Sequence, residues 1–220
     1  MANRKYFTRN TFRGMSELAD NNDREWFAEN KHRYEADIKD ASLSFIEDFA
    51  THLKKLSPHF MAGPRSLFRI YRDVRFAKDK TPYKTHQGAF VAVGPATGWY
   101  VEISPRGLRT GAGFYEAAGT RLASFREAVA HERFGPELES LVAAAVAEGF
   151  ELGGERLKTS PRGFDADHPR IELLRHKSLT LGRSHGFEPV IHTPAALDLV
   201  RDDWRTLRPL VEWLARHCQD

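Results

Sequence analysis

The sequence predicts a single α+β domain in which a small, mainly antiparallel sheet is covered by helices from both ends of the chain. Its 220 residues suffice for one domain with a large core, and the content of 41% hydrophobic and 29% charged residues is close to the globular average. Apolar residues recur at helical spacing near both ends, and short runs of β-branched and aromatic residues lie between them. This segregation is typical of the α+β class, so we expect residues 1–220 to form one domain.

A long amphipathic helix is expected in the N-terminal part. Asn22 is followed three residues later by Glu25, which is the pattern of an N-cap with its capping-box partner, and Trp26 and Phe27 should be the first buried residues. The dipeptide Ser57-Pro58 should end the helix. Between these limits the apolar residues at helical spacing are Tyr34, Ile38, Ala41, Phe45, Phe49, Leu53 and Leu56.

A β-hairpin is expected next. Two short β-type runs, at 88–93 and 99–103, flank a turn at 94–98 that is rich in glycine and proline. A third strand is expected near residues 108–110. The strand period of two should place alternate residues on opposite faces of the sheet. In the second run, Trp99, Val101 and Ile103 should lie on the buried face, and Tyr100 and Glu102 on the other.

Turn and capping signals predict the remaining elements. The last helix should begin at Thr193-Pro194 with one apolar face, and Pro209 should kink or divide it. The elements expected before it are a helix at 122–129, a helix opened by Gly135 and closed by Gly149, a turn-rich loop at 157–169, a short helix at 170–175 and a strand at 178–181.

The positive charge is concentrated in one window. The net charge is +3, yet residues 65–84 contain seven cations and two aspartates, whereas the rest of the chain has 26 cations and 28 acids. We term residues 65–84 the basic segment, because all of the excess positive charge lies there. Its charged residues are Arg65, Arg69, Arg72, Asp73, Arg75, Lys78, Asp79, Lys80 and Lys84.

Guanidinium forks and lysine ammonium groups are suited to phosphate and carboxylate. We therefore expect the basic segment to bind an anionic small molecule. If the backbone is extended, Asp73 shares a face with Arg69 and Arg75 and can orient both. In an enzyme, Asp73 would orient the arginines or act as a base, and Tyr83 would donate a hydrogen bond to the substrate. The expected anion ligands are Arg69, Arg72, Arg75 and Lys80.

Two alternatives stay open for the basic segment. Its cations can form a purely structural ion-pair network with Asp73 and Asp79, with Tyr83 hydrogen-bonded in the core. The basic face can also bind nucleic acid or a protein, although no helix-turn-helix, zinc-finger or RNA-binding signature is present. We expect Tyr71 and Phe76 to be core residues and not stacking platforms.

Part of the basic segment reads Arg69-x-x-Arg72-Asp73-x-Arg75-Phe76-x-x-x-Lys80-x-x-Tyr83. The chain also contains the opening Asn21-Asn22-x-Arg24-x-Trp26-Phe27, the turn Gly111-x-Gly113 and a loop at 162–169 ahead of Lys177. In these motifs the chain resembles DUF2461, a bacterial and fungal family catalogued as a domain of unknown function. The resemblance implies a single domain of bacterial type and of about this size. It implies no established activity and no catalytic residue that could be carried over.

A second basic region runs from Arg156 to Arg183 and contains seven cations and three acids. We expect Arg162 and Lys177 to line the same cleft as the basic segment, with a solvated surface as the alternative. The stretch 165–168, Asp-Ala-Asp-His, has the residue types of a metal or acid–base site. Such residues ahead of a short helix are more typical of caps, so we expect no metal site.

The sequence also bears on the cellular compartment. Cys218 is the only cysteine, so neither an internal disulfide nor a cysteine-rich zinc site is possible, and we expect this thiol to have no catalytic role. No run of about 18 apolar residues occurs, and the N-terminus lacks the apolar stretch of a secretory signal. We expect a cytoplasmic protein with no membrane contact. The sequence indicates neither a cofactor nor an oligomeric state.

Overall fold

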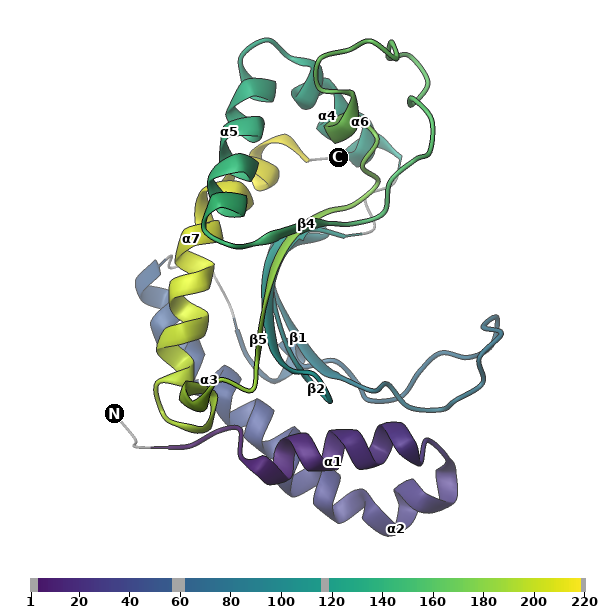
Figure 1. Cartoon of the computed structure of the whole chain (residues 1–220), viewed down its shortest axis with the longest axis vertical. Coiled ribbons are helices and arrows are strands. Elements are labelled where there is room, and N and C mark those ends of the chain that lie inside the picture. Colours follow the sequence, from purple (N-terminus) through teal and green to yellow (C-terminus); the bar gives the residue numbers. More distant parts are fainter. Residues whose placement is uncertain (1–3, 57–61, 116–118, 219–220) are drawn as a thin grey trace. The chain divides into compact units, whose positions relative to one another are not determined.

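The computed structural model describes residues 4–56, 62–115 and 119–218. The fold is α+β, as expected: helices flank a five-stranded antiparallel sheet with the strand order β1-β2-β3-β5-β4 (Figure 1). The strands are β1 (Gln87–Gly94), β2 (Thr97–Ser104), β3 (Gly107–Phe114), β4 (Glu151–Gly153) and β5 (Leu179–Gly186).

Helical elements precede and follow the strands. The α-helices are α1 (Arg9–Asp20), α2 (Arg24–Tyr34), α3 (Asp40–Leu56), α4 (Thr120–Ala130), α5 (Phe134–Ala147), α6 (Ile171–Leu174) and α7 (Ala196–His217). A π-helical segment, η1 (Glu35–Lys39), connects α2 to α3. Two short 3₁₀ helices are η2 (Pro64–Ser66) and η3 (Pro189–His192).

The predicted hairpin is confirmed as β1 and β2. Along β2, Val101 and Ile103 are buried while Tyr100 and Glu102 are half-buried, as the alternation predicts. The third strand is longer than expected. The sequence analysis missed β4, because a strand of three largely exposed residues has no periodic signal; it pairs antiparallel with β5.

A glycine allows β3 to lie close to β5. Gly113 has φ +154°, and a Cβ atom built there would lie 2.1 Å from the carbonyl oxygen of Leu179. Any larger residue would therefore force the two strands apart.

The N-terminal helices differ from the single helix that was expected. The N-cap of α2 is Asp23, whose carboxylate accepts a hydrogen bond from the Trp26 backbone N–H at 2.9 Å, so the prediction of Asn22 as the cap was wrong. Phe27 is buried, whereas Trp26 is only half-buried. The helix α1 was not predicted, and η1 interrupts the long helix. The expected stop at Ser57-Pro58 lies outside the described residues.

The chain divides into two compact units. Unit 1 comprises Met1–Val91, Tyr100–Thr110 and Ser184–Asp202, and unit 2 comprises Ala92–Trp99, Gly111–Arg183 and Asp203–Asp220.

In unit 1, buried residues of α3 and of the first two strands form an apolar core. Phe45 and Ile46 of α3 line one small pocket together with Ala89 of β1 and with Val101 and Ile103 of β2. At the other end of this unit, α1 packs beside α2 and η1 (Figure 1). These helices support one end of the basic segment, as described below.

In unit 2, the core is aromatic. Trp99 stacks on Trp204 of α7 with ring centroids 5.5 Å apart, and Phe125 of α4 packs against Phe114 and Trp213. The helix α7 continues through Pro209, so of the two expected effects, a kink or a division, the division does not occur. No helix in the described part of the chain is both long enough and apolar enough to span a bilayer.

Candidate functional site

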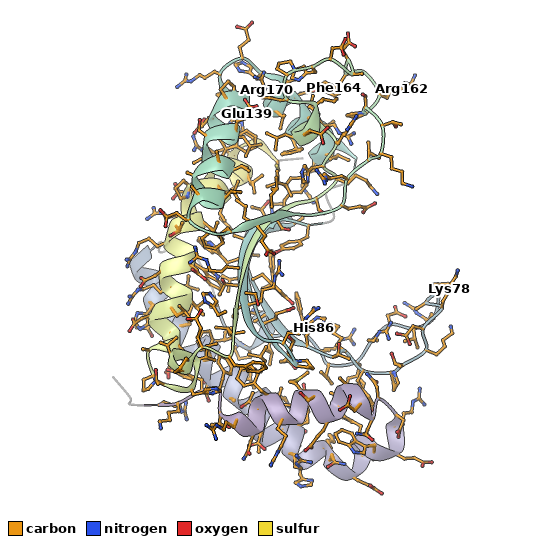
Figure 2. All side chains as sticks on the ribbon, viewed as in Figure 1. Lys78, His86, Glu139, Arg162, Phe164 and Arg170 are labelled. Atoms are coloured by element: carbon orange, nitrogen blue, oxygen red, sulfur yellow. The ribbon has the colours of Figure 1, made fainter. Side chains whose placement is uncertain are left out.

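The basic segment leaves η2 as an extended chain, turns at its far end and returns to β1. Its two arms pair at the base, where the Arg72 N–H donates to the Pro82 carbonyl at 2.9 Å and the Lys84 N–H donates to the Ile70 carbonyl at 2.8 Å. Side chains alternate along the first arm, so that Ile70 is buried and Tyr71 is exposed. Figure 2 shows Lys78 at the far end of the segment and His86 at the sheet.

The base of the basic segment is fastened to the α1–α2 junction. The Asn22 side-chain amide donates to the Tyr83 carbonyl at 2.9 Å and accepts from the Tyr83 N–H at 3.0 Å. The Tyr83 ring stacks on Phe27 of α2 with centroids 4.0 Å apart. Burial, with a further contribution from Tyr71, raises the pKa of the Tyr83 hydroxyl. Tyr83 was predicted to be a substrate donor, and its ring is also a core contact of this unit.

Two ion pairs hold the far part of the segment. The Arg75 guanidinium donates to Asp73 from Nε at 3.0 Å and from Nη2 at 2.7 Å, and this bond lowers the pKa of Asp73. The Arg72 guanidinium contacts Asp79 at 2.5 Å. A hydrogen bond from the Thr81 N–H, followed by the bond from Arg72, lowers the pKa of Asp79 to about 2.

Lys80 is also bonded within the segment. Its Nζ donates to the Val74 carbonyl at 2.8 Å and lies 3.4 Å from the Arg75 carbonyl oxygen. Three of the four anion ligands predicted in the basic segment, Arg72, Arg75 and Lys80, therefore already bond groups of the segment itself. They remain exposed or half-exposed. These contacts give the segment a defined shape.

Arg69 and Lys84 are different. Within the described residues, the Arg69 guanidinium forms no hydrogen bond or ion pair, and the Lys84 ammonium lies over the Phe68 ring at 5.0 Å. Burial and the nearby Arg69 charge lower the pKa of Lys84. The two cations therefore repel each other. Neither forms an ion pair with a carboxylate of the described residues, although the Arg69 charge also helps to lower the pKa of Asp73.

A pair of hydrogen-bonded side chains lies on the face of β2 that points away from the core. The Tyr100 hydroxyl donates to Glu102 Oε2 at 2.6 Å. Gly88 of β1 leaves room for this hydroxyl, because a Cβ atom there would lie 2.5 Å from it. The Phe68 ring lies 6.2 Å from the Tyr100 ring, and its backbone N–H donates to the Gly88 carbonyl at 2.9 Å.

His86 precedes β1 and is half-buried. Burial lowers the pKa of His86; the carboxylate of Glu102 opposes this shift, and the charges of Lys84 and Arg106 add to it. The imidazole is therefore neutral at pH 7.

We term this group of side chains the outer-face cluster. Sequence analysis placed Tyr100 and Glu102 on this face but assigned them no role, and it did not single out His86 or Lys84. The alternation of β2 was the available signal for Tyr100 and Glu102 only, because the other members of the cluster lie outside β1 and β2. The members of the cluster are Phe68, Arg69, Lys84, His86, Tyr100 and Glu102.

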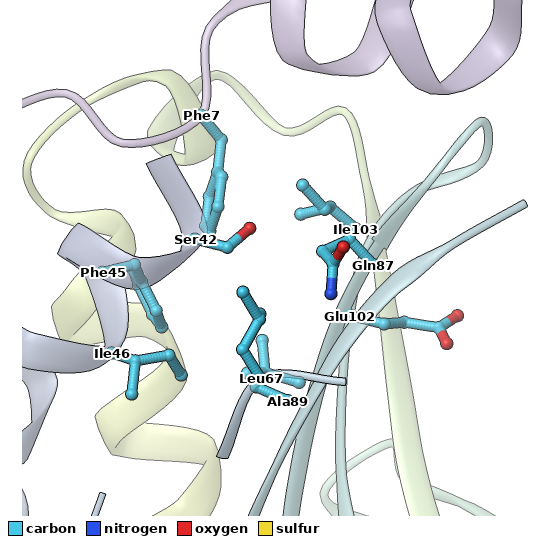
Figure 3. Close-up of a pocket in the computed structure, with 10 residues that line it drawn as sticks. Phe7, Ser42, Phe45, Ile46, Leu67, Gln87, Ala89, Glu102 and Ile103 are labelled. Carbon is cyan, nitrogen blue, oxygen red and sulfur yellow. The ribbon is translucent and has the colours of Figure 1, made fainter. Parts of the chain in front are cut away.

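The core face of the same strands carries a small apolar pocket (Figure 3). Figure 3 shows Glu102 pointing away from Phe45 and Leu67, which line the pocket. The pocket also includes the Ser42 hydroxyl, which is buried and has no hydrogen-bond partner in the described structure. Apart from Ser42, Gln87 and Glu102, whose carboxylate points away, the residues that line it are apolar, so this pocket belongs to the core.

The prediction that Tyr71 and Phe76 are core residues was wrong. Phe76 is 95% exposed and Tyr71 is 53% exposed, although the Tyr71 ring still contacts Phe27 and Tyr83 at its edge. Sequence analysis missed this because it had no means of telling which side of an irregular loop faces the protein.

Arginines of the second basic region bond the ends of helices in unit 2. Arg170 donates to the carbonyls of Val129 and Ala130 at the end of α4, at 2.7 and 3.1 Å, and pairs with Glu139 at 3.8 Å (Figure 2). Arg183 donates to the Glu148 carbonyl after α5. Arginine at a helix C-terminus satisfies free carbonyls and complements the helix dipole.

The predicted ligands in this region have different surroundings. Lys177 forms an ion pair with Glu155. Arg162 is exposed and forms no hydrogen bond or ion pair with the described residues. The expectation that both line one cleft with the basic segment stays a prediction.

The stretch 165–168 forms a turn before α6. Nδ1 of His168 accepts a hydrogen bond from the Arg170 N–H at 3.0 Å within this turn, while Asp165 and Asp167 are exposed. The N-cap of α6 is Arg170, and it forms no side-chain capping bond. Across the described residues, no three His, Cys, Asp or Glu side chains are grouped as metal ligands. Burial raises the pKa of the Cys218 thiol to about 12, so it stays protonated.

These observations define an α+β protein with an ionisable cluster on the outer face of its sheet and a shaped basic segment beside it. Residues 10–213 match the family described as conserved hypothetical protein (DUF2461), and the chain belongs to this family. The resemblance seen in the sequence motifs is thereby confirmed. No curated protein matches the chain.

Proposed function

We propose that the protein binds a small phosphate- or carboxylate-bearing molecule at the outer-face cluster. One observation carries the proposal: Arg69 and Lys84 are held near each other, and neither pairs with a carboxylate in the described part of the chain. An anion between them would remove their mutual repulsion and accept charge-assisted hydrogen bonds from both.

The other members of the cluster suit such a ligand. Tyr100 and Glu102 form a fixed hydrogen-bonded pair, and the neutral His86 can accept a proton. We propose that these three groups contact the part of the ligand that is not charged. The catalytic roles expected for Asp73 and Tyr83 stay predictions.

We propose a structural role for the other predicted ligands of the basic segment. Arg72, Arg75 and Lys80 bond the segment internally, and we propose that they shape it so that Arg69 is presented. Their predicted contact with the anion stays a prediction, as does that of Arg162 and Lys177. The competing structural hypothesis assigns all of these cations to folding alone.

A thermal-shift screen tests the proposal, using phosphate, nucleotides, phosphosugars and dicarboxylates. A ligand at about 100 times its Kd should stabilise the protein by ~2.7 kcal/mol. Arg69→Ala and Lys84→Ala should abolish the shift. Lys78→Ala is the matched control, because Lys78 is an exposed cation of the same segment outside the cluster.

Two results would contradict the proposal. One is that none of these compounds changes the melting temperature. The other is that Lys78→Ala weakens binding as much as Lys84→Ala, which would indicate diffuse attraction to the whole segment.

A further inference from the structure

The basic segment, where the excess positive charge lies, also contains several exposed aromatic rings. In the described part of the chain, the large hydrophobic side chains with high exposure are Phe68, Tyr71, Phe76, Val146, Leu152 and Phe187. Four of these six are aromatic, and three of the four lie in the basic segment. A single exposed ring needs no explanation, but three rings within nine residues of a strongly charged segment do.

The structure presents Phe76 to solvent in a fixed way. The ion pair of Arg75 with Asp73 precedes the ring, and Lys80, which follows the ring, donates from its ammonium to the Val74 carbonyl ahead of the ring. The bond from Lys80 closes the turn that carries Phe76, whose side chain is 95% exposed. A segment that is shaped in advance loses less entropy on binding.

Cations that can reach a ligand lie around these rings. Arg65, Arg69 and Lys78 form no ion pair within the described residues, and all three are exposed. The Arg75 guanidinium lies 5.9 Å from the centroid of the Phe76 ring and remains 77% exposed despite its pairing. The surface therefore combines aromatic faces with unpaired positive charge.

We propose that the basic segment is a binding surface for single-stranded nucleic acid. Bases would stack on Phe76 and on the exposed part of Tyr71, while Arg65 and Lys78 would contact phosphates. Every nucleotide of a single strand offers the face of a base and a phosphate anion. The exposed aromatic rings suit the first and the unpaired cations suit the second. A duplex is a poorer fit, because its base faces are stacked inside the helix. A lipid surface is also a poorer fit, because only one apolar side chain of the segment is fully exposed and could insert.

This surface goes beyond the small-anion site, with which it shares Arg69 and Phe68. Lys78 lies at the far part of the segment, away from the sheet (Figure 2), and Phe76 is two residues before it in the chain. Variants at these two positions therefore serve to separate the two proposals.

Fluorescence anisotropy with a labelled single strand of about 12 nucleotides tests the inference, since known single-strand sites span roughly this length. RNA, DNA and a duplex of the same sequence should be compared at low and moderate salt. Phe76→Ala should weaken single-strand binding about fivefold or more, because that is the usual effect of losing one stacked ring. Phe76→Tyr should bind like the native chain.

Two further variants make the test specific. Phe76→Leu keeps an apolar side chain without a π-face, so it should weaken binding as much as Phe76→Ala. Phe187→Ala removes an aromatic ring that is as exposed as Tyr71 but lies outside the segment, and it should have no effect. Lys78→Ala should lower the slope of log affinity against log salt by about 0.7, the value for one phosphate contact in a single strand.

The inference fails if no single strand binds at low salt, or if the duplex binds as tightly as the single strand. It also fails if Phe76→Leu behaves like the native chain, or if Phe187→Ala weakens binding as much as Phe76→Ala. Binding to anionic vesicles that depends on Phe76, without binding to oligonucleotides, would assign the surface to membranes instead. Loss of small-anion binding in Lys84→Ala with native oligonucleotide binding would separate the two sites.

Discussion

Replacing Asn22 by alanine should destabilise the protein through the basic segment, not through a helix cap. The Asn22 amide makes two hydrogen bonds with the backbone of Tyr83, at 2.9 and 3.0 Å, and a net value of about 1 kcal/mol for each gives a loss of about 2 kcal/mol. Because Lys84 follows Tyr83 directly, the same change should weaken small-anion binding. Helix α2 should keep its cap, which is Asp23.

Urea denaturation of matched variants measures this effect. Asp23→Ala removes the cap and should lower the unfolding free energy by about 1 kcal/mol without changing ligand affinity. Asn22→Asp keeps the acceptor for the Tyr83 N–H but loses the donor, so its loss of stability should lie between those of the native chain and Asn22→Ala. If Asn22→Ala costs no more than Asp23→Ala and leaves anion binding unchanged, the reasoning is refuted.

Three further predictions concern the sheet and its two faces. Gly88→Ala should displace the Tyr100 hydroxyl, which would lie 2.5 Å from the new Cβ, and a calorimetric titration with phosphate should detect weaker binding in a folded protein. Burial lowers the pKa of His86, so the unfolded chain takes up this proton at a higher pH than the folded chain. The unfolding free energy therefore decreases as the pH falls. His86→Gln should reduce the decrease in unfolding free energy that is measured between about pH 7 and pH 5. Arg183→Met should lower the unfolding free energy by about 2–3 kcal/mol, because Asp203 is buried and loses this partner; an unchanged urea midpoint would contradict this.

Local patterns in the sequence predicted much of the fold. The hairpin of β1 and β2 followed from two β-type runs around a glycine- and proline-rich turn, and the alternation of Val101 and Glu102 followed from the strand period. The helices α4 and α5 also lie where apolar spacing and glycine signals placed them. Such features depend on residues that are close together in the sequence, and therefore the sequence alone predicts them.

The candidate site was only partly predictable. Sequence analysis pointed to the basic segment and to Arg69, because a local excess of cationic residues can be counted in the sequence. It did not distinguish Arg69 from Arg72, since that difference depends on which carboxylate lies within reach in the folded chain. His86 was missed for a similar reason: its lowered pKa comes mainly from burial, with smaller contributions from the charges of Lys84 and Arg106.

The sequence by itself determined the α+β class and the place where positive charge accumulates, because residue spacing and composition show both. Its motifs also carried the resemblance to the family that the comparison confirmed. Tertiary structure decided which cations are paired, that Asn22 bonds Tyr83 instead of capping α2, and that Phe76 faces solvent. The physical reason is that pairing and exposure depend on how the backbone folds back: Asn22 meets Tyr83 from 61 residues away, and Arg72 meets Asp79 only because the basic segment turns. Such contacts are set when the segments pack, and no local pattern encodes them.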